Sequence, residues 1–410
     1  MGTSLGQAEQ TRAALGSSAV RWRAVLARSP WAPAALVFVC YAVWTAIFLL
    51  HGHDARDFIT IGSKWVHRGH GIAAIALDPH RHYGNMGYDG QFYYFIALDP
   101  AHAAAYLDAP AYRYTHIGYP LLARLLALGQ PGLVPYALIA VNVLAIAGGT
   151  LAVAAWLRRS GISPWLALLY GFYPGLMVAF RYDLVEPLGY ALAALGVYLF
   201  AFGGRRRLLW AGLSFAAAAL TRESTAIFPV AYAVALLLHD LRPQTWRARL
   251  AANARRAGTL LAVALGTYAA YQVFLAAWLG SAGLKRNVAP DLLPFGGLLV
   301  HASEPNALAL AVTVALPGLV CIAAAVWALR RGAASAEAWA LLLNAVALTM
   351  LLPPVSYVDY TAAGRIATGV VLAALLAVRA VGRRRWWLWM AALLWLAALP
   401  LVPVWPLLGL

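Results

Sequence analysis

The sequence predicts an all-α polytopic membrane protein with about eleven transmembrane helices. Of the 410 residues, 63% are hydrophobic and 11% are charged, and the mean hydropathy is +0.71. In a soluble domain, apolar residues make up nearer half of the chain and charged residues near a quarter. Apolar runs of about 20 residues recur along the sequence, and each can cross a bilayer core of roughly 30 Å. An ordinary soluble protein is therefore excluded.

The chain divides into a short tail and one transmembrane domain. Residues 1–30 are polar and contain arginine without a signal-peptide cleavage site, so we expect a cytoplasmic tail. Residues 31–410 form the transmembrane domain, in which residues 51–130 are an external catalytic loop that ends in a short interfacial helix near 116–129. Spans are expected at about 31–50, 133–157, 163–180, 184–203, 207–221, 223–240, 257–279, 306–329, 336–353, 363–381 and 386–408.

Basic residues are concentrated in alternate loops. With the N-terminus in the cytoplasm, the inner segments hold twenty of the 31 basic residues and three of the fifteen acidic residues. This asymmetry follows the positive-inside rule for multi-pass proteins. Topology therefore explains the formal charge of +16, and no nucleic-acid partner is needed. We expect a bacterial plasma-membrane protein whose functional face is external.

The loop between the first two spans carries the densest set of polar residues. Residues 51–120 contain six of the fifteen acidic residues and most of the histidines. Two aspartates are candidate general bases: Asp57, just after the first span, and Asp89, in the glycine-flanked turn GYDGQFYY. A carboxylate with a reference pKa of about 3.9 is ionised at neutral pH and can accept a hydroxyl proton. The flanking glycines would allow close approach of a ligand, and the aromatic rings would stack on a sugar.

The histidines of this loop raise the question of a metal. The seven considered as metal ligands are His51, His53, His67, His70, His80, His82 and His102. Their spacings match no recognised metal signature, so no residue is assigned as a metal ligand. A divalent cation, Mg²⁺ or Mn²⁺, is left open as a cofactor.

The remaining charged residues cluster in the external loops. A charge at membrane depth costs roughly 2.5–3.5 kcal/mol on insertion scales, which makes such residues functional candidates. External arginines can bind phosphate oxygens bidentately, although pairing with nearby carboxylates is an alternative. The candidate substrate-binding residues are Asp54, Tyr88, Gln91, Tyr93, Arg113, Arg181, Asp183, Glu186, Arg222, Glu223, Tyr360 and Arg365, with Arg222 and Arg365 expected to contact phosphate.

Two stretches resemble a known superfamily. YDGQFYYFIA followed by YRYTHIGYPLLARLLALG resembles the WDxxxYxxIA…FFPLYPLL pattern of GT-C mannosyltransferases that act on phosphatidylinositol glycans. On this match Asp89 takes the place of the family aspartate, and Tyr88 replaces the usual tryptophan. GYDGQFYY also resembles a motif of bacterial membrane proteins. Asp57-Phe-Ile-Thr-Ile-Gly is similar to the DxxVY stretch of polyprenyl-phosphomannose-dependent mycobacterial enzymes, so the two resemblances nominate different bases.

The resemblance implies a GT-C type glycosyltransferase. Such an enzyme moves a sugar, mannose or another hexose or pentose, from a polyprenyl-phosphate donor to a lipid, glycan or protein acceptor, with inversion and an aspartate base. The alternative is a transporter or flippase of a lipid-linked or anionic solute, which predicts polar residues in mid-bilayer. Asn142, Gln272 and Asn344 are the few such residues. A noncatalytic scaffold for an envelope assembly is a third interpretation.

Overall fold

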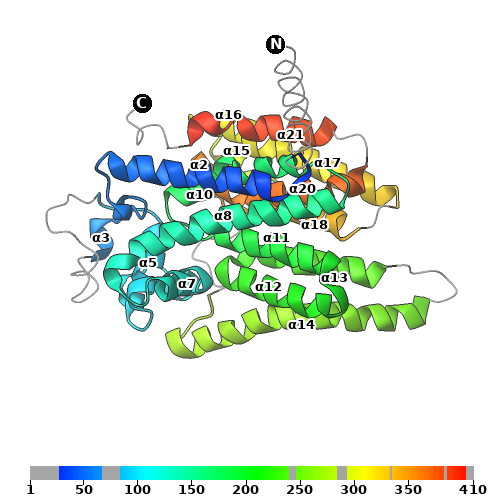
Figure 1. Cartoon of the computed structure of the whole chain (residues 1–410), viewed down its shortest axis with the longest axis horizontal. Helices are drawn as coiled ribbons and strands as arrows, with labels where there is room; N and C mark the ends of the chain where they lie inside the picture. Colours follow the sequence, from blue (N-terminus) through cyan, green and yellow to red (C-terminus); the bar gives the residue numbers. More distant parts are fainter. Residues whose placement is uncertain are drawn as a thin grey trace, which may run out of the picture.

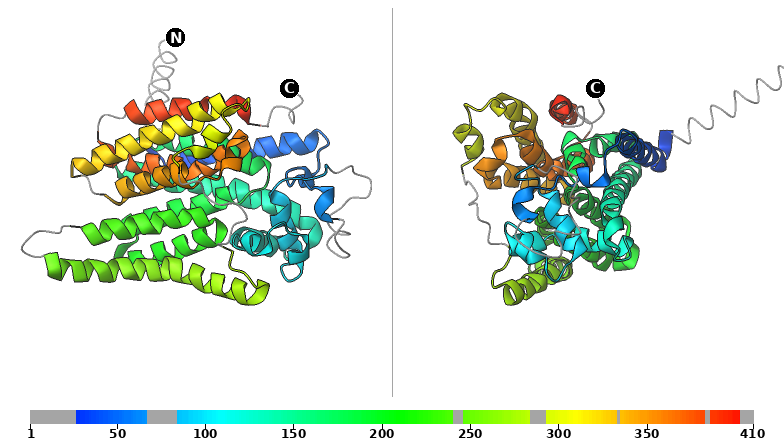
Figure 2. Two further views of the ribbon diagram at one scale, coloured as in Figure 1. Left: turned by 180° about the vertical axis from the view of Figure 1, so that it is seen from behind. Right: turned by 90° about the vertical axis from the view of Figure 1, so that its left-hand side faces the viewer.

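The computed structural model describes residues 27–66, 84–239, 246–283, 293–332, 335–382 and 386–402. Within these ranges the chain is helical and contains no strand, which confirms the predicted all-α class. The long helices run roughly side by side along the longest axis of the molecule (Figures 1 and 2). Most of the predicted tail, and the loop residues His67, His70, His80 and His82, lie outside the described ranges.

Five helical segments within the described ranges are long and apolar enough to cross a bilayer. They are Trp31–Leu50 (α2), Pro131–Arg159 (with α8, Val134–Arg159), Arg249–Leu279 (within α14, Trp246–Leu279), Ala307–Arg330 (α16, Ala307–Leu310, to α17, Leu316–Arg330) and Tyr360–Val381 (α19, Tyr360–Ile366, and α20, Thr368–Val381). Each overlaps a predicted span. These segments are consistent with a multi-pass membrane protein.

The other apolar helices are shorter or bent. The helices α11 (Glu186–Phe202) and α12 (Arg207–Thr221) meet at a bend of 120°, and together they have the length and apolarity of a span. Three more apolar helices have 10–17 residues and lie within Glu223–Leu238 (ending in α13, Ile227–Leu238), Ala336–Leu351 (α18) and Trp386–Leu401 (beginning with α21, Trp386–Leu396).

Two predicted helices differ from the structure. The expected span 163–180 is broken into Pro164–Ala167, α9 (Leu168–Gly171) and α10 (Pro174–Arg181). Pro174 explains the second break, because its ring forces the preceding Tyr173 into an extended conformation and suits the first turn of a new helix. The expected interfacial helix 116–129 is shorter: α7 spans Gly118–Leu126, after α6 (Pro110–Tyr114). Exposed leucines on α7, including Leu125, suit an interfacial position.

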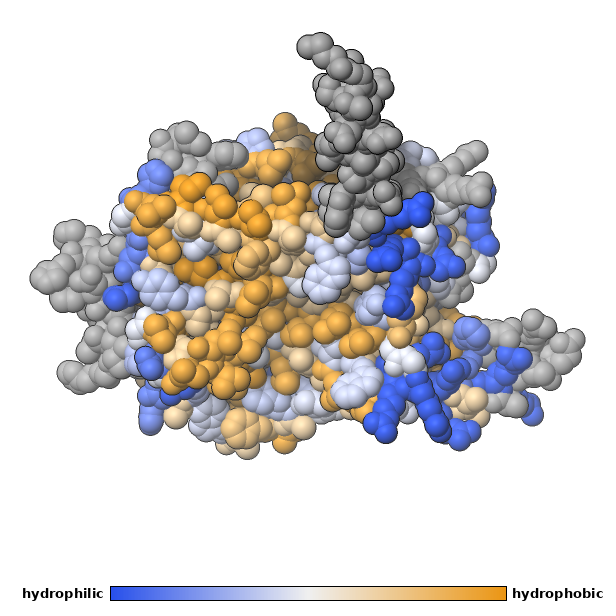
Figure 3. All heavy atoms as spheres, viewed as in Figure 1, coloured by the Kyte–Doolittle hydropathy of each residue, from blue (hydrophilic) through white to orange (hydrophobic). Residues whose placement is uncertain are grey.

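The burial of the helices separates a core from a lipid-facing surface. In the segment of α19 and α20, 83% of the most apolar window is buried, against 28% for α2 and for α14. The outer helices expose apolar side chains such as Val43 and Phe274. Figure 3 shows a broad apolar band over the middle of the molecule, with hydrophilic side chains toward both ends. Such a band is expected where helices contact lipid tails.

The two ends of the molecule carry different segments. The helices α3 (Ser63–Val66), α5 (Gly90–Leu98) and α7 lie at one end in Figure 1, and the arginine-rich start of α14 lies at the other. These segments, which come from the two groups of loops that the charge pattern distinguishes, thus lie far apart along the molecule. We call the end that holds α5 and α7 the loop end.

Candidate functional site

A chain of ion pairs lies at the loop end and begins at Asp89. The Oδ1 of Asp89 accepts from Arg113 Nη2 at 2.8 Å, and its Oδ2 accepts from Arg365 Nη2 at 2.7 Å. Asp89 immediately precedes α5, whereas Arg113 belongs to α6 and Arg365 to α19. Burial opposes ionisation of Asp89, but the two guanidinium charges and their hydrogen bonds outweigh it and hold its pKa well below the usual range. Asp89 is therefore a weak base that joins three elements.

Arg113 is fixed on every side. Its Nε and Nη2 donate to the two carboxylate oxygens of Asp108, both at 2.7 Å, in the bidentate geometry that arginine favours. Its guanidinium also lies over the Phe92 ring, 4.4 Å from the centroid. Asp108 is one of the six acidic residues of the loop, and it is not among the predicted site residues. Three of the five N–H donors of Arg113 are thus engaged by carboxylates.

The chain of ion pairs continues through Glu186 to Arg222. Glu186, the fully buried first residue of α11, lies 3.5 Å from Arg365 Nη1 and 3.6 Å from Arg222 Nη2. Arg222 Nη1 lies 3.8 Å from Glu223 Oε2. These contacts are longer than good hydrogen bonds, and Arg222 Nε has no hydrogen-bond partner among the described residues. Arg222 therefore keeps donors that a ligand can use.

A buried histidine ends the chain of ion pairs. His116 is inaccessible to solvent, and its Nε2 lies 2.7 Å from Glu223 Oε2 while its Nδ1 lies 3.2 Å from the Tyr93 hydroxyl. Burial lowers the pKa of His116 despite the opposing charge of Glu223, so the ring is neutral at pH 7. We assign the Nε2–H tautomer, in which His116 donates to Glu223 and accepts from Tyr93. A single histidine in YRYTHIGYP forms no motif, and sequence reasoning missed it.

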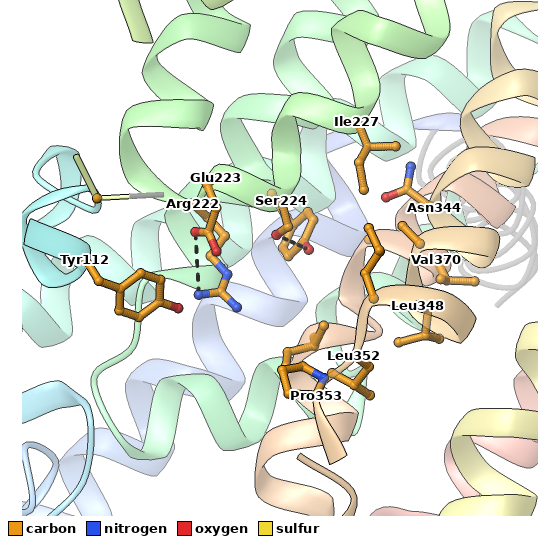
Figure 4. Close-up of a pocket in the computed structure, with 16 residues that line it drawn as sticks. Tyr112, Arg222, Glu223, Ser224, Ile227, Asn344, Leu348, Leu352, Pro353 and Val370 are labelled. Carbon is orange, nitrogen blue, oxygen red and sulfur yellow. Dashed lines mark hydrogen bonds and ion pairs between the residues drawn. The ribbon is translucent and has the colours of Figure 1, made fainter. Parts of the chain in front are cut away.

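A cavity of about 490 Å³ opens beside this end of the ion-pair chain. Tyr112, Arg222, Glu223 and Ser224 supply polar groups to its wall. Apolar side chains of α18, α20 and the segment between α18 and α19 supply most of the rest, including Leu348, Leu352 and Val370. Figure 4 shows Tyr112, Arg222 and Glu223 on one side of the cavity and these apolar residues across from them. The cavity thus joins a charged region to an apolar slot.

A second polar cluster lies in the turn between α10 and α11. Asp183 is fully buried in a left-handed conformation, with φ of 49°. Its Oδ1 accepts from Tyr119 Oη at 3.3 Å and from Asn142 Nδ2 at 3.5 Å. Burial raises the pKa of Asp183 to about 8, so its carboxyl is largely protonated at neutral pH. The mid-span Asn142 is therefore explained by this cluster, whose hydrogen bonds join Asp183, Tyr119 and Asn142.

Asp54 and Asp57 form a separate turn. Asp54 Oδ1 accepts from Arg56 N at 2.8 Å, and Asp57 Oδ2 accepts from Asp54 N at 2.8 Å, which together make a capping box. Arg181 Nη1 donates to the backbone oxygen of Asp57 at 2.7 Å. Asp57 thus contacts Arg181 through its backbone oxygen, whereas the Asp89 side chain contacts Arg113 and Arg365. The two candidate bases are thus held in different surroundings.

Three predicted aromatic or amide residues have internal contacts. Gln91 accepts from Gly62 N at 2.8 Å and donates to Met86 O at 3.0 Å, so its amide holds the loop together. Tyr88 stacks on Tyr182 with centroids 4.2 Å apart. Tyr360 packs within the apolar core. These contacts hold the Gln91 amide within the loop and place Tyr360 in the core, and contact of either residue with a substrate stays a prediction.

The glycines that flank Asp89 serve the packing of the chain. A Cβ at Gly90 would contact the backbone oxygen of Tyr182, and a Cβ at Gly87, which has φ of +64°, would contact Gly62 N and Thr60 O. Sequence reasoning attributed these glycines to the close approach of a ligand. In the structure, the close approach is that of other backbone segments, which fixes the turn that carries Asp89.

The described residues contain no group of three or more histidine, cysteine or acidic side chains that could hold a metal ion. Of the loop histidines within them, His102 contacts Asp99 at 2.9 Å, His53 lies 3.6 Å from Asp57, and His51 contacts Ile47 O at 2.8 Å. The fold and site define a multi-pass helical protein with a buried ion-pair chain at one end. Comparison with family models, curated proteins and solved structures found no match for this chain.

Proposed function

We propose that this protein is a membrane glycosyltransferase of the GT-C type that takes its sugar from a polyprenyl-phosphate donor. The observation that carries the proposal is the cavity, in which arginine, glutamate and tyrosine face an apolar slot between α18 and α20. A lipid phosphate has the same division into a charged head and an apolar chain. A soluble sugar nucleotide would have no use for the apolar part.

Arg222 is the proposed phosphate contact. It lines the cavity, it is buried, and its Nε has no hydrogen-bond partner among the described residues. A guanidinium in this state can donate two parallel hydrogen bonds to a phosphate and stabilise the charge that develops on the leaving group. Arg365 supports this position indirectly, because both arginines contact Glu186 Oε1. The sugar would then lie between Arg222 and Tyr112.

The proposal extends to topology and location. We propose about eleven spans in a bacterial plasma membrane, with the N-terminus cytoplasmic and the site external. The placement of α3, α5 and α7 at one end of the molecule and of the arginine-rich start of α14 at the other supports this orientation. The acceptor would be a lipid, glycan or protein at the outer surface, and a Mg²⁺ or Mn²⁺ requirement stays open to the assay.

Binding and transfer test the proposal separately. Farnesyl phosphate, a short polyprenyl phosphate, should bind the purified protein in detergent, whereas farnesol and inorganic phosphate should bind at least about tenfold more weakly. Arg222→Gln should weaken the binding of farnesyl phosphate. Arg56→Gln, which changes an arginine outside the cavity, should leave this binding unchanged. Transfer is measured with labelled sugars on polyprenyl phosphate. Equal binding of farnesol and farnesyl phosphate, with no transfer from any donor, would refute the proposal.

A transporter or flippase is the second candidate function, and Asp183 is the observation that favours it. A buried carboxyl with a pKa of about 8 can exchange a proton near neutral pH, as a proton-coupled carrier requires. Asp183 does not line the 490 Å³ cavity, however, so proton exchange and the proposed ligand would be at different places. Proton-dependent movement of a fluorescent lipid phosphate across reconstituted vesicles would favour the transporter over the enzyme.

A further inference from the structure

A second cavity, of about 350 Å³, is enclosed by α17, the end of α20 and the start of α21. Its volume lies within the range of about 300–1,000 Å³ that is usual for ligand pockets. All of the described side chains that line it are hydrophobic, among them Val320, Ala324, Val381, Trp387 and Met390. The interior of this cavity therefore suits an apolar chain and offers nothing to a charged group.

The two cavities lie at different levels of the molecule. Val370 lines the first and Val381 the second, and a rise of about 1.5 Å per residue places these positions about 16 Å apart along α20. The helix α20 runs away from the loop end, because it follows Arg365, which Asp89 holds there. The second cavity therefore lies toward the end of the molecule that holds the arginine-rich start of α14 (Figure 1).

One face of α17 changes from apolar to cationic along its length. Ala324, Trp327 and Arg331 follow one another at spacings of three and four residues, which places them on the same side of the helix. Ala324 and Trp327 line the cavity, and the guanidinium of Arg331 lies over the Trp327 ring, 4.3 Å from its centroid. This cation–π contact holds a positive charge at the rim of the cavity. Arg331 is itself exposed, so its N–H donors are accessible.

The wall formed by α21 reaches from the core to the outer surface. Trp387 is buried, whereas its neighbour Trp386 is largely exposed, and both line the cavity. Tryptophan is enriched where the bilayer meets water, because its ring is apolar and its N–H is polar. A cavity that opens at this level can take an acyl chain from the bilayer while the headgroup of the same lipid stays beside Arg331.

We propose that this cavity binds one anionic phospholipid, with an acyl chain against Ala324 and Trp387 and the phosphate beside Arg331. A guanidinium can donate two parallel hydrogen bonds to phosphate oxygens. A zwitterionic lipid carries its own cation next to its phosphate, so Arg331 gains less from it than from an anionic lipid. This lipid site is separate from the first cavity and does not depend on the proposed sugar transfer.

The charge of the headgroup is tested with two lipids that share the same acyl chains, phosphatidylglycerol and phosphatidylcholine. Native mass spectrometry of the purified full chain in detergent measures Kd for the first bound lipid. The wild type should prefer phosphatidylglycerol about fivefold or more, the size of the attraction of one basic residue to anionic lipid. Arg331→Gln should lose this preference.

Arg159→Gln is the matched control for the charge. The guanidinium of Arg159 also lies over an aromatic ring, that of Phe202, 4.7 Å from its centroid, but Arg159 belongs to α8, which contributes no described residue to the second cavity. Arg159→Gln should keep the preference for phosphatidylglycerol. Equal binding of the two lipids by the wild type would overturn the proposal. Loss of the preference in both arginine variants alike would also overturn it, because the charge of the whole end would then select the lipid.

The place of the acyl chain is tested by filling the cavity. Ala323 lines it and is exposed, so Ala323→Trp should raise Kd for phosphatidylglycerol at least about tenfold. Ala262→Trp, at an exposed position of α14 outside the cavity, should leave this Kd within about twofold. Unchanged binding in Ala323→Trp would show that the chain does not enter the cavity. If that variant does not fold, Ala323→Leu makes the same test with a smaller side chain.

Discussion

Arg365 donates from Nη2 to Asp89 Oδ2 at 2.7 Å, although 276 positions separate the two residues. This ion pair ties α19, the first part of the most buried of the five candidate spans, to the turn that begins α5. Asp89 carries the loop motif, and Arg365 is also 3.5 Å from Glu186. The first loop is therefore fastened to the core of the bundle through charges, and its position depends on residues near the end of the chain.

A double-mutant cycle should reveal strong coupling between Asp89 and Arg365. Arg365→Gln leaves a largely buried carboxylate with one guanidinium instead of two, and we expect it to cost about 3 kcal/mol of unfolding free energy. Asp89→Asn should cost a similar amount, and the double variant should fall short of additivity by about 1–3 kcal/mol. Denaturant unfolding in mixed micelles measures all four proteins. Asp99→Asn, at the exposed pair with His102, should change stability by within about 0.5 kcal/mol. Additive effects of the two changes would contradict the cycle.

The helices were more predictable than the site, because a span needs only a local run of apolar residues. The bounds of α12, Arg207–Thr221, coincide with the predicted span 207–221. The contact of His116 with Glu223 joins residues 107 positions apart, and no local pattern records it. One-sided placement of polar loops did bring Asp89, Glu186, Arg222 and Arg365 together as candidates. Which of them pair, and which face a cavity, depends on tertiary packing that residue spacing does not encode.

Asp183 should make stability depend on pH in a definite direction. Its pKa in the folded protein, about 8, is above the usual carboxyl value of 3.8, so folding favours its protonated form. Its contribution to stability is therefore complete below pH 3.8 and is lost as pH rises through about 8. Asp183→Asn keeps the shape and removes the ionisation. The temperature of thermal unfolding of the wild type should decrease as the pH is raised from about 6 to about 9.5. The decrease should be smaller for Asp183→Asn, because this variant lacks the carboxyl that ionises.

The pKa of Asp183 is influenced by Tyr119, Asn142 and Arg181. None of these residues is changed in Asp183→Asn. Asp359→Asn is the matched control, because Asp359 is an exposed N-cap of α19 and asparagine caps helices equally well. The control should follow the wild-type pH dependence. Identical pH dependence of wild type and Asp183→Asn would show that the Asp183 carboxyl is ionised in the folded protein.

Accessibility from the two sides of the membrane checks the proposed orientation. In a Cys40→Ser, Cys321→Ala background, an impermeant maleimide should label Ala101→Cys in intact cells and Arg205→Cys only after permeabilisation. Both positions are exposed, Ala101 after α5 and Arg205 in the turn between α11 and α12. Reversed labelling would place the ion-pair chain on the cytoplasmic side. Labelling of both variants in intact cells would indicate that α11 does not cross the membrane.

Filling the apolar slot should separate lipid recognition from phosphate recognition. Ala347 on α18 lines the cavity, so Ala347→Trp would occupy the space proposed for the polyprenyl chain without touching Arg222. We expect Kd for farnesyl phosphate to rise at least about tenfold, because burial of each CH₂ group contributes about 0.8 kcal/mol and several would be displaced. Inorganic phosphate, which has no chain, should be unaffected at the same concentration.

Ala276→Trp is the matched control for this change, since Ala276 is exposed on α14 and does not line the cavity. It should leave farnesyl phosphate binding within about twofold of the wild type. If Ala347→Trp also binds farnesyl phosphate normally, the chain does not enter the slot between α18 and α20. A phosphate still bound by Arg222 would then not indicate a lipid donor, because that contact alone does not require an apolar chain.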